Sequence, residues 1–249
     1  MLTVLAVSQA IGLAGLLTWV VVTGESFPGA QELLPAVGAG IAGVIGLGAL
    51  YRGFAVGAMG IVAPISAAAP IIPLVADATN GDVPAPLQWL GIALVLVGIG
   101  VLSREPASTR NARIASGAGL AIVAALGFGL FVVGIDAGSD ESPAWAVVVA
   151  RSAAVPLAVF AALVTSTSLR PAMALVPMLV VVGIGDVSAN VLVATATTYG
   201  AAGIVAVLST IYPVVTVVLA RLVLREKLSR VKRAGGVVAL AGAALVAAG

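Results

Sequence analysis

Two charged side chains, Arg151 and Asp186, lie deep within apolar stretches of this sequence. A turn centred near Ser168 separates the two stretches, with Arg151 17 residues before it and Asp186 18 residues after it. At about 1.5 Å of rise per helical residue, both side chains should lie at nearly the same depth of an antiparallel helical hairpin. Because a charge in lipid is costly, we expect the two to form an ion pair.

Two interpretations of this pair remain open. In the first, the charges neutralise each other and fix the packing of the helices. In the second, Asp186 lines a cavity together with Asn190, one turn further along the same helical face, and Arg151 gates or orients a substrate. A carboxylate at this depth is also a candidate acceptor for a coupling proton. The sequence therefore marks Arg151, Asp186 and Asn190 as substrate or coupling-ion candidates.

Tyrosines and prolines supply the other candidates. A tyrosine offers a hydroxyl and an aromatic face to a small organic ligand, so we add Tyr51, Tyr199 and Tyr212 to the substrate candidates. Pro70 and Pro213 each fall inside an apolar stretch, where a proline frees a backbone carbonyl and kinks a helix. They are interpreted either as static kinks or as hinges for a conformational change.

Composition defines the medium that surrounds these residues. Of the 249 residues, 61% are hydrophobic and 9% are charged, whereas soluble domains carry about 25% charged residues. This excludes a soluble globular protein. A formal net charge of +2 on so few charges also excludes a nucleic-acid binder. Without Cys or His, disulfides and the commonest metal ligands are absent, so we expect no enzyme, no metal site and no cofactor.

Apolar runs of the length that spans a bilayer account for most of the chain. They do not alternate in polarity as barrel strands would, so we predict an all-α integral membrane bundle. The nine expected spans are residues 3–23, 35–54, 57–77, 86–103, 114–135, 144–165, 171–195, 200–222 and 232–248.

An internal repeat organises these spans. Residues 60–70 match residues 203–213 at six of eleven positions with an offset of 143. At an offset of 144, Gly91 and Gly98 fall on Gly235 and Gly242. We therefore predict two repeat units, residues 1–103 with four helices and 114–249 with five. The first unit lacks a counterpart of span 114–135; either a start upstream of Met1 supplies it, which we favour, or the protein works with nine spans.

Charge in the loops predicts the orientation. Three arginines lie in 104–113, Arg170 lies in the next turn on that side, and six basic residues lie in 221–233. The alternate connections carry only acidic residues. The positive-inside rule then places Met1 inside and the C-terminus outside. Because each complete unit has an odd number of helices, the two units should have opposite orientations, as in many secondary transporters.

Several segments resemble one known family. In the second half they are Gly185-Asp-Val-Ser-Ala-Asn190, Leu208-Ser-Thr-Ile-Tyr-Pro213, the stretch from Arg221 to Glu226, and Gly235 to Gly242. In the first half they are Tyr51-Arg-Gly, Ala63-Pro-Ile-Ser66 with Pro70, and Gln88-x-x-Gly91. Over essentially the whole chain, the sequence is similar to EamA-type transporters of the drug/metabolite transporter (DMT) superfamily.

The resemblance implies a ten-helix fold of two inverted five-helix repeats, of which this sequence carries nine helices. It also implies alternating-access transport of a small metabolite, amino acid or drug-like solute, and we favour export. The expected partners are a small-molecule substrate, a coupled proton and the lipid bilayer of the cell (inner or plasma) membrane. The family is expected to have both termini cytoplasmic, unlike the charge-based orientation. The alternative is a non-transporting membrane scaffold or a subunit of a heteromeric membrane complex.

Overall fold

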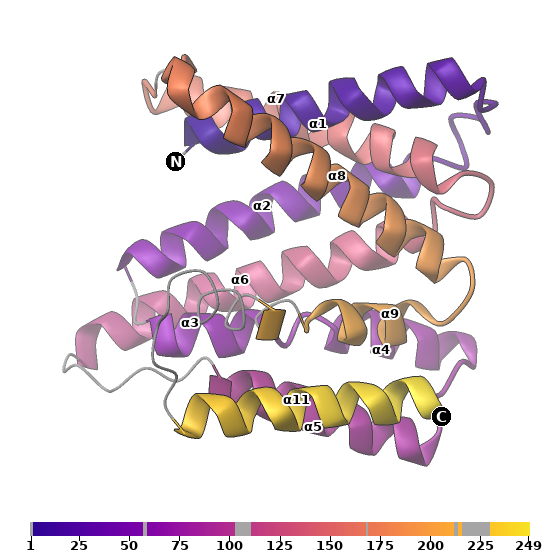
Figure 1. Ribbon diagram of the computed structural model, residues 1–249, viewed down its shortest axis with the longest axis vertical. Helices are drawn as coiled ribbons and strands as arrows, with labels where there is room; N and C mark the ends of the chain where they lie inside the picture. Colours follow the sequence, from indigo (N-terminus) through magenta and orange to yellow (C-terminus); the bar gives the residue numbers. More distant parts are fainter. Residues whose placement is uncertain (1, 57–58, 103–110, 168, 212–213, 216–229) are drawn as a thin grey trace. The chain divides into compact units, whose positions relative to one another are not determined.

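The protein is described here from a computed structural model, which places residues 2–56, 59–102, 111–167, 169–211, 214–215 and 230–249 (Figure 1). These residues are helical or in turns, with no strand among them, which confirms the predicted all-α fold. The helices are α1 (Leu2–Thr23), α2 (Leu34–Val56), α3 (Met59–Ser66), α4 (Ile71–Asn80), α5 (Pro86–Leu102), α6 (Asn111–Asp136), α7 (Pro143–Val164), η1 (Met173–Leu175), α8 (Val176–Thr197), α9 (Ala202–Ser209) and α11 (Arg230–Ala248).

The chain divides into two compact units, and each combines segments from both halves of the sequence. Unit 1 comprises Met1–Val44 and Leu130–Gly200, and unit 2 comprises Ile45–Gly129 and Ala201–Gly249. The long helices α2 and α6 contribute one part to each unit.

Unit 1 has its hydrophobic core between α1, α2, α6, α7 and α8. Leu16 and Val20 of α1 pack there with Ile135 of α6 and Val147 of α7. Helices in lipid associate through close van der Waals packing, and small residues allow their backbones to approach. A Cβ atom added at Gly134 of α6 would lie 2.8 Å from the carbonyl oxygen of Pro35.

Unit 2 is built around the antiparallel pair α5 and α11 (Figure 1). A Cβ atom added at Gly91 would lie 2.6 Å from the carbonyl oxygen of Gly242, and one added at Gly98 would lie 2.7 Å from that of Gly235. The repeat offset of 144 relates Gly91 to Gly235 and Gly98 to Gly242. Swapping each residue for its repeat equivalent therefore turns the Gly91–Gly242 contact into the Gly98–Gly235 contact.

The predicted span 57–77 is not one helix, and this corrects the sequence-based expectation. Helix α3 ends at Ser66 and α4 begins at Ile71. Across the break, Ala68 N–H, Ala69 N–H and Ile71 N–H each bond a carbonyl three residues back. Pro70 has no N–H to continue the α-helical pattern, so this short turn replaces the kink that we expected at Pro70.

Helix α9 has the same length as α3. Both have eight residues, and their first and last residues are related by the offset of 143. The residue before α9, Ala201, offers no side-chain cap. Asp77 of α4 takes this role instead, because its Oδ2 accepts a 2.6 Å hydrogen bond from Gly203 N–H in the first turn of α9.

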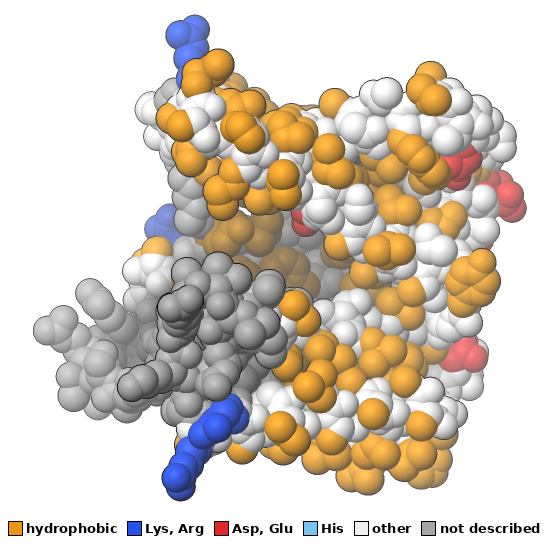
Figure 2. All heavy atoms as spheres, viewed as in Figure 1, with side chains coloured by type: hydrophobic (Ala, Val, Ile, Leu, Met, Phe, Trp, Pro, Cys, Tyr) orange, Lys and Arg blue, Asp and Glu red, His pale blue; other side chains and the backbone are white. Residues whose placement is uncertain are grey.

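Apolar length confirms much of the span assignment. Among the described residues, five helices are long and apolar enough to cross a membrane, and α5 and α11 are shorter apolar helices. The predicted span 200–222 is described as far as residue 211, which includes α9, and at 214–215; its other residues lie outside the described ones. Large hydrophobic side chains face outward on α8 and on α11, as Figure 2 shows, which suits a lipid environment.

Candidate functional site

Helix α7 presents Arg151 about two and a half turns after its start. The helix begins at Pro143 because Ser142 caps it: the Ser142 Oγ accepts a 3.1 Å hydrogen bond from Trp145 N–H. The same hydroxyl bonds Glu25 Oε1 in the connection that follows α1. Trp145 Nε1 also donates to the Glu25 carbonyl oxygen at 3.1 Å. These contacts join the end of α1 to the start of α7.

The predicted ion pair is present in unit 1. Arg151 Nη2 of α7 lies 2.6 Å from Asp186 Oδ2 of α8. The two partners differ in exposure, because the Arg151 side chain is 10% exposed and the Asp186 side chain 44%. The arginine is thus held inside the helix packing, while the carboxylate is nearly half exposed.

A third side chain, Gln9 of α1, completes the cluster. Gln9 Nε2 donates to Asp186 Oδ2 at 3.4 Å, so three helices meet at one carboxylate. Gln9 Oε1 is buried and has no hydrogen-bond partner in the described structure. Sequence reasoning missed Gln9; the signal available was a side-chain amide within an apolar span, but its partner on α8 is far away in sequence.

Asn190 lies one turn beyond Asp186, as expected, but its side chain turns back to its own helix. Asn190 Nδ2 donates to the Asp186 carbonyl oxygen at 2.7 Å. The Asn190 amide group therefore bonds the backbone of its own helix. This bond does not involve the Asp186 carboxylate.

A close crossing of α1 and α8 lies beside the cluster. A Cβ atom added at Gly12 would lie 2.6 Å from the Gly183 carbonyl oxygen, so a side chain there would force the helices apart. The two helices run in the same direction, since Gly12 meets Gly183 while Leu16 and Trp19 meet the later residues of α8.

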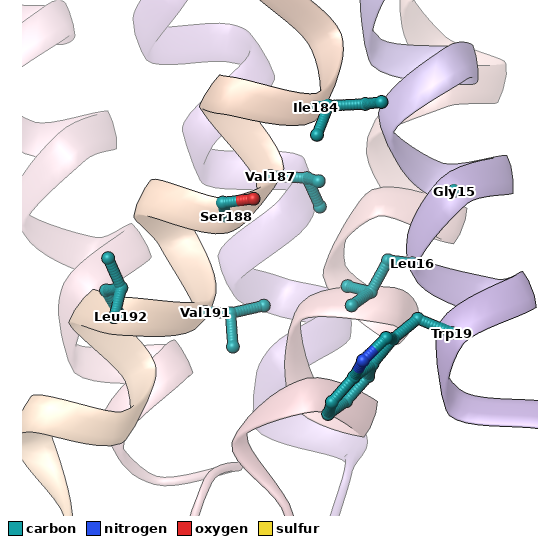
Figure 3. Close-up of a pocket in the computed structure, with 8 residues that line it drawn as sticks. All are labelled: Gly15, Leu16, Trp19, Ile184, Val187, Ser188, Val191 and Leu192. Carbon is teal, nitrogen blue, oxygen red and sulfur yellow. The ribbon is translucent and has the colours of Figure 1, made fainter. Parts of the chain in front are cut away.

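Beyond this crossing the two helices line a half-open apolar pocket of about 450 Å³ (Figure 3). Ser188 supplies a hydroxyl to an otherwise apolar lining, and Trp19 closes one side with its indole ring. The lining residues are Gly15, Leu16, Trp19, Ile184, Val187, Ser188, Val191 and Leu192. The volume is within the range of small-molecule sites, and Asp186 adjoins Val187 of the lining along α8.

The remaining candidates lie elsewhere. Tyr51 is half-buried on the part of α2 that belongs to unit 2. Tyr199 follows the end of α8 with 87% of its surface exposed, and it is not among the pocket-lining residues. Tyr212 and Pro213 lie outside the described residues. Among the described residues, no group of three or more acidic side chains could hold a metal ion.

The described residues thus include five apolar helices of membrane-spanning length, and unit 1 holds both an ion pair and an apolar pocket. The family model described as "EamA-like transporter family" matches residues 115–248. The chain belongs to this family. It is therefore a multi-pass membrane protein and a transporter of the drug/metabolite type, with a small-molecule substrate and a lipid surrounding.

A solved structure titled "Crystal structure of protein" has the same fold. It is 16% identical in sequence, its TM-score is 0.86, and the match covers 99% of this chain and 88% of that chain. At this identity the comparison establishes the fold alone. No curated protein matches the sequence.

Proposed function

We propose that this protein is a secondary active transporter that exports a small amphipathic solute by alternating access, and that Arg151 and Asp186 bind the polar group of this solute. The observation that carries the proposal is the half-exposed Asp186 carboxylate on α8, a helix that also lines the apolar pocket. An amphipathic solute needs both features, an apolar wall for its body and a charged group for its polar end.

The coupling energy is assigned to an ion or solute gradient. The sequence contains no phosphate-binding motif that would support an ATP-driven mechanism. Asp186 is the proposed site of a coupled proton, because its carboxylate is partly exposed and accepts hydrogen bonds from both Arg151 and Gln9. Neutralising this carboxylate would weaken its attraction for Arg151 and change the cluster that the solute meets.

Alternating access is supported by the relation between the two sequence repeats. Helices α3 and α9 have bounds that differ by one offset, and the Gly91–Gly242 and Gly98–Gly235 contacts exchange under the other. Such exchange is what a two-fold relation between repeats 1–103 and 114–249 would produce. The α-helical bonding pattern is interrupted at Pro70 by a short turn, which suits the proposed hinge there and, by the repeat, at Pro213.

Export, and a place in the plasma membrane, are supported by the charge pattern. With Met1 inside, α1 and α8 both run outward, and the pocket lies on the outer side of the ion pair. A solute that leaves the charged cluster would then move along the pocket towards the acidic loops.

The test separates binding from packing by exchanging the two charges. Metabolites released by cells that overproduce the wild-type chain are compared with those of cells that produce Arg151→Asp/Asp186→Arg or Asp186→Asn. We expect the wild type to enrich one or a few solutes in the medium at least about tenfold over an empty vector, and both variants to abolish this enrichment. Thr18→Val is the matched control, because the Thr18 hydroxyl bonds only the carbonyl oxygen of Ala14 in its own helix.

The exchanged pair keeps the ion pair and therefore the packing, so its abundance in the membrane should equal that of the wild type. Normal release of the same solutes by the exchanged variant would show that the pair has a packing role alone. A wild-type chain that enriches no solute would contradict export.

A further inference from the structure

Helices α4 and α9 pack directly against each other in unit 2 (Figure 1). A Cβ atom added at Gly203 of α9 would lie 2.7 Å from the Cα atom of Leu74, so the two backbones are as close as a glycine allows. Leu74 is 3% exposed and belongs to the hydrophobic core of this unit. One turn further along α4, the buried Asp77 carboxylate accepts the hydrogen bond from Gly203 N–H. Both contacts therefore converge on the first turn of α9.

The Gly203 N–H group is a donor of a kind that helices commonly satisfy locally. The first N–H groups of a helix have no partner within it, and a Ser, Thr, Asp or Asn just before the helix can accept from one of them. Ala201 occupies that position and provides no such acceptor. The acceptor lies instead on another helix, so this donor has its side-chain partner only while α4 is packed against α9.

The sequence repeat shows that this bond belongs to one half of the chain. The offset of 143 that relates α3 to α9 places Gly60 at the position equivalent to Gly203. It places Ala220 at the position equivalent to Asp77, and an alanine side chain has no acceptor. The repeat therefore provides a carboxylate at only one of the two equivalent positions.

We propose that Asp77 is a conformational restraint, whose bond to Gly203 N–H favours the state of the transport cycle in which α4 and α9 are packed together. This inference rests on the proposed alternating access. Two repeats with identical contacts would favour neither state, whereas a bond made in one of them alone stabilises the state that contains it. A turn already separates α4 from α3, so α4 is a short helix whose position depends on its contacts with neighbouring helices.

The sequence contains no cysteine, so one introduced thiol reports on the contact alone. Leu74→Cys places this thiol between α4 and α9, and its rate of maleimide labelling is measured on the full chain in lipid nanodiscs. We expect Asp77→Ala to raise the rate at least about tenfold, the value of one hydrogen bond to a charged group. Asp82→Ala is the matched control: it removes an exposed carboxylate just beyond α4 and should leave the rate within about twofold.

A second variant separates the restraint from simple capping of α9. Ala201→Asp supplies an acceptor at the start of α9 itself, so Asp77→Ala/Ala201→Asp restores a cap without restoring the bond between the helices. We expect the Leu74→Cys thiol to keep its raised labelling rate in this variant. A return to within about twofold of the rate with Asp77 intact would show that Asp77 only caps α9, and would overturn the inference.

A thiol in unit 1 separates local opening from general unfolding. Ala146 of α7 is fully buried, and labelling of Ala146→Cys should not change when Asp77 is replaced. An equal rise at this position would overturn the inference, as would an unchanged rate at Leu74→Cys. Asp77→Asn keeps the shape of the side chain and covers the case in which Asp77→Ala does not fold. We expect it to raise the rate about threefold, because its bond lacks the charge, and no rise would again overturn the inference.

These results are independent of the charge-exchange experiment. A wild-type chain that releases no solute would contradict the proposed function, yet the labelling rates would still show whether Asp77 holds α4 against α9. Conversely, an unchanged labelling rate in Asp77→Ala would remove the restraint and leave the release of solute by the wild type unexplained only in its conformational bias.

Discussion

The two units use polar side chains in opposite ways. In unit 1, Arg151, Asp186 and Gln9 bond one another across three helices, and one carboxylate remains accessible. In unit 2, the buried Asp77 bonds the backbone of α9, and both amide atoms of Gln88 bond backbone groups.

This difference separates polar side chains that bond one another from polar side chains that bond the backbone. A polar side chain that bonds backbone has a fixed partner and leaves no capacity for a solute. A polar cluster made from side chains has partners that can rotate away, and the one in unit 1 keeps an unpaired acceptor. Unused capacity for hydrogen bonds, and not the number of charges, is what separates the polar cluster of unit 1 from the polar side chains of unit 2.

The largest expected change in the free energy of unfolding comes from removing one partner of the Arg151–Asp186 ion pair. Asp186→Leu leaves the 10% exposed Arg151 side chain without its partner, and we expect the free energy of unfolding to fall by about 3 kcal/mol. Arg151→Leu leaves a carboxylate that is already accessible, so the loss should be about 1 kcal/mol. Unfolding by SDS in mixed micelles, followed by tryptophan emission, measures both values. Equal losses would contradict the difference in accessibility between the partners.

A smaller effect is expected for the structural carboxylate of unit 2. Asp77→Ala removes the side chain that caps α9, and we expect a loss of about 2 kcal/mol, because Ala201 provides no substitute. Asp77→Asn retains an oxygen acceptor and should lose about half as much. The exposed Asp82 provides the control, since Asp82→Ala should change the free energy of unfolding by less than about 0.5 kcal/mol. Unchanged stability in Asp77→Ala would show that the cap is dispensable.

The smallest effect compares the two glutamines. Gln88→Met removes two bonds to the backbone and should lower the free energy of unfolding by about 1 kcal/mol. Gln9→Met removes one long bond together with an unsatisfied acceptor, so its stability should stay within about 0.5 kcal/mol of the wild type. The same SDS titration ranks the two variants. A reversed order would mean that Gln9 has a structural role and would remove the contrast between the units.

Much of the helical fold could be predicted from the sequence, because the length and hydropathy of a membrane span are local properties. The bounds of α1, α7 and α8 lie within a few residues of the predicted spans. The sequence predicts a kink or a hinge at Pro70, but it does not predict that the helix is interrupted between α3 and α4. A kink and a break differ in which hydrogen bonds the neighbouring residues form after Pro70 removes one donor, and local composition does not specify that choice.

The candidate site was predicted in part. Counting residues from one turn was enough to place Arg151 opposite Asp186, since a hairpin fixes the relative depth of its two helices. Gln9 belongs to a helix that is distant in sequence, and no repeat or hairpin relates it to α8. The pocket depends on the contact of Gly12 with Gly183, which is a property of the tertiary packing.

That glycine contact has a mechanical consequence. The two helices touch at this point, and the part of α1 that lines the pocket extends beyond it. Trp19 lies seven residues beyond Gly12, about 10 Å along the helix axis. A change of about 10° in the crossing angle would therefore displace α1 at Trp19 by about 2 Å, while the backbones at the glycine contact stay together. The same pair of glycines that brings the helices together thus lets a small rotation change the width of the pocket.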